Sequence, residues 1–211
     1  METSKWIMTI GTAATLVSGP VSASTGGLLH DPGSIVMRIY NMDRLSDARL
    51  DATIAAADRI LRGTGITAVW LKCTAPADSD AARCRASVGD LDFVVRLQRA
   101  RSDGYAHTCG SAVRPQAPQV GHVITLFLDC AERTADTFCV QYPTVLACSL
   151  AHELGHLLLP TSRHSNCGIM VGTPSAQDWQ RAAVGRFRFS DREAAQMRAG
   201  VEERVRAAGA R

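Results

Sequence analysis

The chain has 211 residues and a formal net charge of +3, and 46% of its residues are hydrophobic. This length suits one domain and can bury a core without external staples. The basic residues are scattered, which argues against a nucleic-acid-binding surface. No segment beyond the N-terminal region has the apolar length of a membrane span, so we predict no stable membrane insertion.

The N-terminus has the pattern of an export signal. Lys5 precedes an apolar or small stretch over residues 6–17, and Val21-Ser22-Ala23 offers the small residues that a signal peptidase accepts. The apolar stretch is too short to remain as a membrane span. We therefore predict a signal peptide over 1–23, a single domain over 24–211, and a secreted or periplasmic protein.

The seven cysteines all follow this segment, which agrees with export to an oxidising compartment. Cys73 and Cys84 flank one polar segment, and Cys130 and Cys139 flank another. Loops of this size predict the disulfides Cys73–Cys84 and Cys130–Cys139. The remaining cysteines are Cys109, Cys148 and Cys167. Three cannot all pair with one another, so at least one thiol stays free or pairs between molecules.

Apolar runs and their periodicity predict alternating strands and helices. The predicted strands are 34–40, 67–73, 92–97, a weaker edge strand 104–113, and 122–129. The predicted helices are 46–62, 143–159 and 190–208. Ser190 is the expected N-cap of the last helix, with Glu193 at the capping-box position.

The chemistry lies on the second predicted helix, in the run His152-Glu153-Leu-Gly-His156. Two histidines four residues apart lie one turn apart on one helix face, so both imidazoles can reach one metal ion. This is the zinc-protease pattern, in which the glutamate acts as general base on the water that the zinc activates. We predict one catalytic Zn²⁺ held by His152 and His156, with Glu153 as the catalytic residue.

A catalytic zinc needs a third protein ligand and one open position. His164 follows the helix on a loop that can return to the metal, and it is the favoured third ligand. Asp178 and Glu193 are rival carboxylate ligands, although a capping role explains Glu193 better. Cys167 offers a thiolate that would hold the enzyme latent; a disulfide with Cys148 is the favoured alternative.

These residues resemble the site of the metzincin zinc endopeptidases. The resemblance covers residues 147–170 closely and the element order more loosely, and the same string is similar to that of a group of bacterial secreted proteins. In metzincins the pattern is HExxHxxGxxH; here Leu159 and Ser162 stand at the glycine and third-histidine positions, and His164 comes two residues later. The resemblance implies that Met170, in Gly168-Ile-Met170, forms the methionine turn under the metal.

The resemblance also implies an α+β fold of the zincin type. Such a fold has a twisted mixed sheet with an antiparallel edge strand, the active-site helix below the sheet, and here a C-terminal helix. The predicted function is zinc-dependent hydrolysis of peptide bonds in a protein or peptide substrate, as an endopeptidase. The alternative function is a secreted metal-binding or partner-binding protein on the same scaffold without efficient turnover, and a zinc hydrolase acting on a non-protein amide is a weaker option.

Overall fold

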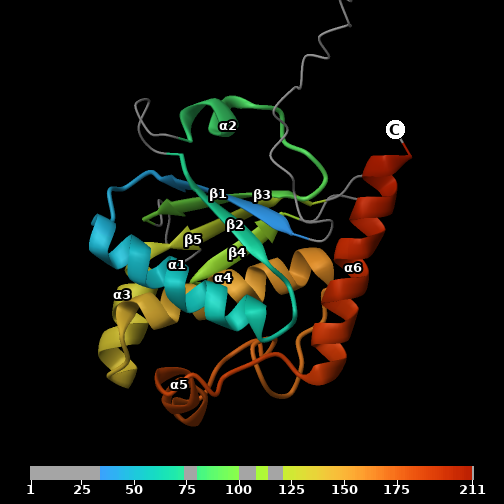
Figure 1. The fold of residues 1–211 in the computed structure, drawn as a ribbon. Coiled ribbons are helices and arrows are strands. Elements are labelled where there is room, and N and C mark those ends of the chain that lie inside the picture. The colour runs from blue at the N-terminus through green and yellow to red at the C-terminus, as the bar shows by residue number, and fades with distance from the viewer. Residues whose placement is uncertain (1–33, 74–79, 100–107, 114–120, 211) are drawn as a thin grey trace, which may run out of the picture.

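The computed structural model describes residues 34–73, 80–99, 108–113 and 121–210 (Figure 1). The predicted signal peptide, residues 1–23, lies outside the described residues. Within the described ranges, no helix combines the length and the hydrophobicity that crossing a membrane requires.

Five strands form one mixed sheet in the order β2-β1-β3-β5-β4. They are β1 (Ile35–Asn41), β2 (Ala68–Lys72), β3 (Asp92–Gln98), β4 (Gly110–Val113) and β5 (Val123–Phe127). The strands β2, β1, β3 and β5 run parallel, whereas β4 pairs antiparallel with β5 at the edge. The predicted mixed sheet with an antiparallel edge strand is confirmed, although the first part of the predicted edge strand 104–113, residues 104–107, lies outside the described ranges.

Three of the six helices in the described residues were predicted from periodicity. The helices are α1 (Asp47–Arg62), α2 (Ala81–Arg85), α3 (Leu128–Phe138), α4 (Tyr142–Leu158), α5 (Ala176–Ala183) and α6 (Asp191–Gly209). The prediction missed α2, α3 and α5. The helix α3 replaces the end of the predicted strand 122–129 and the loop expected after it. Its buried residues Leu128, Ala131 and Ala135 follow helical spacing, so they pack as one helix face.

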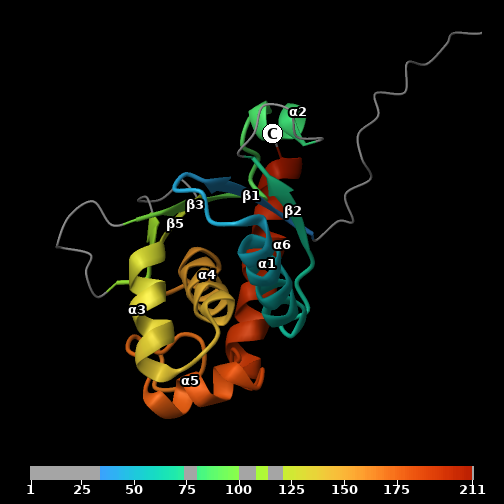
Figure 2. The ribbon, with the colours of Figure 1, turned by 90° about the vertical axis from the view of Figure 1, so that its left-hand side faces the viewer.

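The helices α1, α3 and α4 cover one face of the sheet, and α2 lies on the opposite face (Figures 1 and 2). Because side chains alternate along a strand, β1 presents Ile35, Met37 and Ile39 to the helical side. These three residues are at most 2% exposed, and they share one core with Leu146 and Leu154 of α4. On this face of the sheet, α4 lies between α1 and α3 (Figure 2).

The C-terminal helix α6 is anchored by one buried arginine. Arg204 donates hydrogen bonds to the carbonyls of Asp90 (2.9 Å), Gly121 (2.9 Å) and Leu157 (3.1 Å). Its guanidinium carbon lies 4.7 Å from the ring centroid of Phe93. This side chain therefore joins α6 to the starts of β3 and β5 and to the end of α4.

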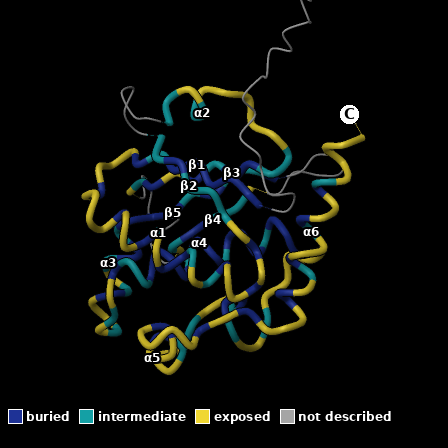
Figure 3. The backbone as a smooth tube through the Cα atoms, viewed as in Figure 1, coloured by how far each residue is buried: buried dark blue, intermediate teal, exposed yellow. Residues whose placement is uncertain are grey.

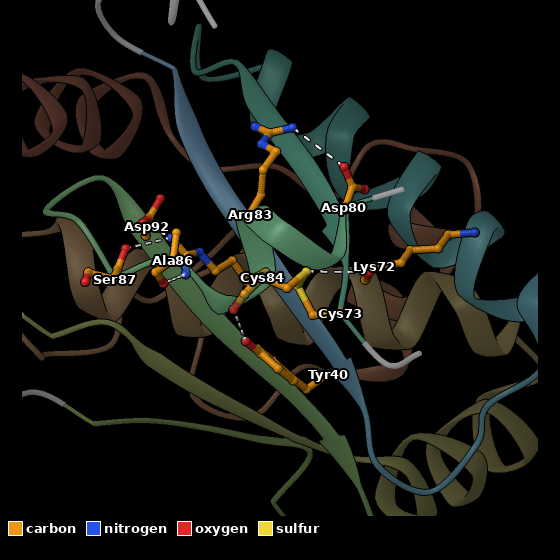
Figure 4. Close-up of a disulfide and its surroundings, with 10 residues drawn as sticks. Tyr40, Lys72, Cys73, Asp80, Arg83, Cys84, Ala86, Ser87 and Asp92 are labelled. Atoms are coloured by element: carbon orange, nitrogen blue, oxygen red, sulfur yellow. Dashed lines mark hydrogen bonds and ion pairs between the residues drawn. A yellow bond between two sulfur atoms is a disulfide. The ribbon is translucent and has the colours of Figure 1, made fainter. Parts of the chain in front are cut away.

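On the opposite face, the predicted disulfide Cys73–Cys84 is present and joins β2 to α2 (Figure 4). The Tyr40 hydroxyl donates to the Cys84 carbonyl at 3.0 Å. Arg38 of β1 donates to the carbonyl of Ala86, the C-cap of α2, at 2.6 Å, and forms a buried 2.6 Å ion pair with Asp92 of β3. These contacts hold α2 against the outer side of β1 and β3, away from the predicted zinc ligands.

The predicted disulfide Cys130–Cys139 is wrong, because Cys130 pairs with Cys109 across a Cα–Cα distance of 5.0 Å. Cys130 lies in the first turn of α3 and Cys139 is its C-cap. A helix of that length separates the two Cα atoms by about 13 Å, beyond the roughly 7 Å that a disulfide can span. The possible Cys148–Cys167 bond is also absent, because Cys148 is a buried free thiol and Cys167 an exposed one.

Candidate metal centre and active site

Most residues of the helix α4 are buried (Figure 3), and its half-buried positions include three polar residues. Pro143 lies in its first turn, where the missing N–H costs nothing, and Pro160 disfavours helical geometry in the residue before it. Along the helix, Ser149, His152 and His156 are half-buried among buried neighbours. Their spacing of three and four residues turns them to one side, so the helix aims both histidines into the same cleft.

The structure brings His152, His156 and His164 together. Their candidate ligand atoms all lie within 4.8 Å of one another. The Nε2 atoms of His152 and His156 are 3.0 Å apart, and the ring of His164 lies 5.1 Å from each of their ring centroids. Three imidazoles converging at the wall of an open cleft match the donor set of a catalytic zinc, which keeps one position free.

The backbone fixes the orientation of the His152 ring. Its Nδ1 lies 2.7 Å from the carbonyl oxygen of Ile169 and donates to it, so the Nε2 lone pair faces the other histidines. Burial lowers the pKa of His152, and the neighbouring His164 lowers it further, whereas the Ile169 carbonyl and Glu193 act in the opposite direction. The neutral imidazole that a metal requires is thus the favoured form.

The Glu153 carboxylate lies between α4 and the edge strand β4. The residue is 7% exposed, and burial raises the pKa of its carboxyl group to about 7, partly offset by a hydrogen bond from the Ala112 backbone. A Cβ atom at Gly110 would be only 2.6 Å from the Glu153 Cγ. The lack of a side chain at Gly110 therefore lets β4 close over the carboxylate.

Two side chains of the loop after α4 pack closely against glycine residues. A Cβ at Gly155 would overlap the Met170 Sδ, so this glycine of the helix creates the notch that the fully buried methionine occupies. A Cβ at Gly172 would lie 2.7 Å from the His164 Nδ1. The exposed His164 ring therefore lies on the backbone of the same loop, while Met170 packs against the helix that carries the other two histidines.

Both rival carboxylates lie in helix caps. Asp178 accepts hydrogen bonds from the backbone and hydroxyl of Ser175 at the start of α5. Glu193 does the same with Ser190 at the start of α6, which confirms the predicted capping box. Among the described residues, the only group of three or more potential metal ligands is the histidine cluster. The exposed Cys167 is outside that group.

A cleft of about 670 Å³ opens beside the histidines. The ring of Trp179 lies 6.2 Å from that of Phe138 and 6.3 Å from that of Phe187, and these three aromatic side chains form one wall. Glu153 is the one carboxylate among the described lining residues, which include no lysine or arginine. The cleft beside the metal centre thus has an apolar wall.

Sequence reasoning missed this wall because it missed two helices. Phe138 belongs to α3 and Trp179 to α5. For α5 the signal was present: Ser175 and Asp178 form a capping box with the same spacing as the predicted Ser190 and Glu193. The role of Gly110 had no sequence signal, because it depends on which residue of another element lies opposite.

Comparison with known proteins supports the fold. The crystal structure of archaemetzincin from Methanopyrus kandleri matches with a TM-score of 0.51 and 16% sequence identity, covering 83% of this chain and 99% of that one. No family model matches the chain, and no curated protein matches it. At this identity the likeness concerns the fold, and the chain accordingly has a metzincin-like fold with the three histidines at one site.

Proposed function

We propose that this protein is a zinc metallopeptidase that cleaves peptide bonds within its substrates. The observation that carries the proposal is the convergence of His152, His156 and His164 beside the buried carboxylate of Glu153. The metzincin-like fold and the archaemetzincin likeness agree with it. The zinc would be held by His152, His156 and His164. Met170, which packs against Gly155 of α4, would anchor the loop that carries His164.

The mechanism assigns one proton-transfer role to the chain. When bound, zinc supplies Lewis-acid chemistry that activates water and polarises the scissile carbonyl. Glu153 takes a proton from the attacking water and delivers it to the leaving amine nitrogen. Burial raises the pKa of Glu153 to about 7, which suits a group that must both accept and release a proton near neutral pH.

The walls of the cleft support an extended, apolar substrate. The strand β4 is at the edge of the sheet, and an edge strand can pair with an extended peptide through its backbone groups. The aromatic wall of Phe138, Trp179 and Phe187 favours a large uncharged side chain near the scissile bond. We infer that the substrate is a protein or peptide carrying such a residue.

Export of the protein belongs to the same proposal. Two disulfides, Cys73–Cys84 and Cys109–Cys130, suit an oxidising compartment. With the signal-like residues 1–23, they support a secreted or periplasmic location.

The test is cleavage of a peptide library by the zinc-loaded protein. We expect cleavage that a chelator abolishes, and a loss of about 10²–10⁴-fold in kcat for Glu153→Gln with zinc content unchanged. Retention of wild-type cleavage by Glu153→Gln would overturn the assignment of Glu153. Zinc binding without any cleavage by the wild type would favour a binding protein on the same scaffold.

A further inference from the structure

The loop that carries His164 is tied to the start of α6 by one side-chain hydrogen bond. The hydroxyl of Ser165, the residue after His164, donates to the Oε1 of Glu193. The two residues are far apart in sequence, and the bond crosses from the metal loop to a separate helix. It is therefore a tertiary contact of the residue adjacent to a predicted zinc ligand.

Glu193 is buried and uses both of its carboxylate oxygens. Glu193 is only 7% exposed. The Oε2 accepts from the backbone N–H of Ser190 at 2.8 Å and from its hydroxyl at 2.9 Å, and the Oε1 accepts from Ser165. The helix cap thus holds the carboxylate in place, which makes it a fixed anchor for Ser165.

The capping box of α5 shows that the additional bond is a separate feature. There Asp178 accepts from Ser175 in the same way, but its second oxygen accepts from Arg181 of the same helix at 3.2 Å. Both capping boxes satisfy the first turn of their helix. Only the α6 box, among these two, also reaches the loop of the metal centre.

Ser165 also joins His164 to the methionine turn. Its backbone N–H donates to the Met170 carbonyl at 2.8 Å, and it forms a bridge with Val171. The backbone of Ser165 therefore closes the loop, while its side chain fixes the closed loop to α6. Rotation of this residue would move the His164 ring that precedes it.

We propose that Ser165 and Glu193 are positioning residues that hold His164 in its metal-binding orientation, so that the N-terminus of α6 sets the affinity for zinc. This inference rests on the proposed zinc site but not on peptide cleavage. Groups that orient a metal ligand typically contribute about 10–100-fold in metal affinity.

The experiment measures zinc affinity of the full chain by competition with a chromogenic chelator, together with thermal unfolding of the metal-free protein. We expect Ser165→Ala to bind zinc about 10–100-fold more weakly, and Ser165→Thr, which keeps the hydroxyl, to recover most of that loss. The matched control is Ser175→Ala, which removes the capping hydroxyl of α5. We expect it to lower Tm by about 2–4 °C and to leave zinc affinity unchanged.

A double-mutant cycle separates the pair from the general stability of α6. We expect Glu193→Ala to weaken zinc binding, and the double variant Ser165→Ala/Glu193→Ala to bind zinc as weakly as Glu193→Ala alone. Wild-type zinc affinity in Ser165→Ala, or losses in the two single variants that add in the double variant, would overturn the proposal. If the zinc-loaded wild type cleaves no peptide, the proposed function is refuted. Weaker zinc binding by Ser165→Ala than by that wild type would still support this inference.

Discussion

The metal centre has a helical half and a loop half, and the two are held in different ways. On α4, His152, Glu153 and His156 owe their relative positions to helical spacing and to the buried faces around them. On the loop, His164 depends on contacts with residues distant along the chain, such as Glu193 through Ser165. Because of this difference, we expect substitutions in the loop to weaken metal binding without unfolding α4.

The contact between the two halves should be the most costly to break. Met170 is fully buried and fills the notch at Gly155. We expect Met170→Ala to lower the free energy of unfolding by about 2–5 kcal/mol, and Gly155→Ala by about 1–3 kcal/mol through overpacking. Denaturant unfolding measures both. In the double variant the added Cβ occupies space left by the methionine. The loss of unfolding free energy should therefore be smaller than the sum of the losses in the two single variants, and strictly additive losses would contradict this contact.

The two disulfides should separate cleft geometry from stability. Replacing either pair by serines should cost about 3 kcal/mol of unfolding free energy, because the entropic cost depends only on the logarithm of loop length and the sequence separations are 11 and 21 residues. Cys109 immediately precedes β4, which covers Glu153, whereas Cys73 and Cys84 lie on the other face of the sheet. We expect peptide cleavage at 25 °C to fall only when Cys109 and Cys130 are replaced. An equal fall in both variants would show that cleavage follows stability alone.

The loop half should respond to a single methyl group. In Gly172→Ala the new Cβ meets the His164 ring, so we expect zinc to bind about 10-fold more weakly. The matched control is Gly209→Ala, where nothing lies within 4 Å of the added Cβ. Isothermal titration with zinc measures both variants. Equal zinc affinities would mean that the position of His164 does not limit binding.

The smallest effect concerns thiol reactivity in the two halves. Burial raises the pKa of Cys148 on α4 to about 12, whereas Cys167 on the loop is exposed. At pH 8 we expect iodoacetamide to label Cys167 readily and Cys148 only after unfolding, as peptide mass mapping would measure. Since the unfolded thiol ionises near pH 9, the stability linked to Cys148 should decline as the pH rises from 9 towards 12. Rapid labelling of native Cys148 would show that α4 opens.

The same division governs what could be predicted from the sequence. The spacing of His152 and His156 fixes their common face once a helix is assumed, so local reasoning suffices. The strands were also predictable, because their apolar runs are short and well separated. The helix α3 was misread as a loop because its polar outer face hides the buried spacing of Leu128, Ala131 and Ala135. That error produced the wrong Cys130–Cys139 disulfide.

The supports of the loop half could not be predicted in this way. The bond from Ser165 to Glu193 and the contact of Gly110 with Glu153 join residues from separate elements. Such pairs become visible only when the topology is known, because no local pattern states which elements meet. His164 was chosen from its place after the helix, and the structure brings it to the other two histidines.

The most direct test of the account is X-ray absorption at the zinc edge for the wild type and for His164→Ala. The account predicts three imidazole nitrogens at about 2.0–2.1 Å in the wild type and two in the variant. The control is His122→Ala, since His122 bonds to the Asp92 carbonyl, away from the cluster, and should leave the spectrum unchanged. Identical zinc spectra for the wild type and His164→Ala would contradict the three-histidine site.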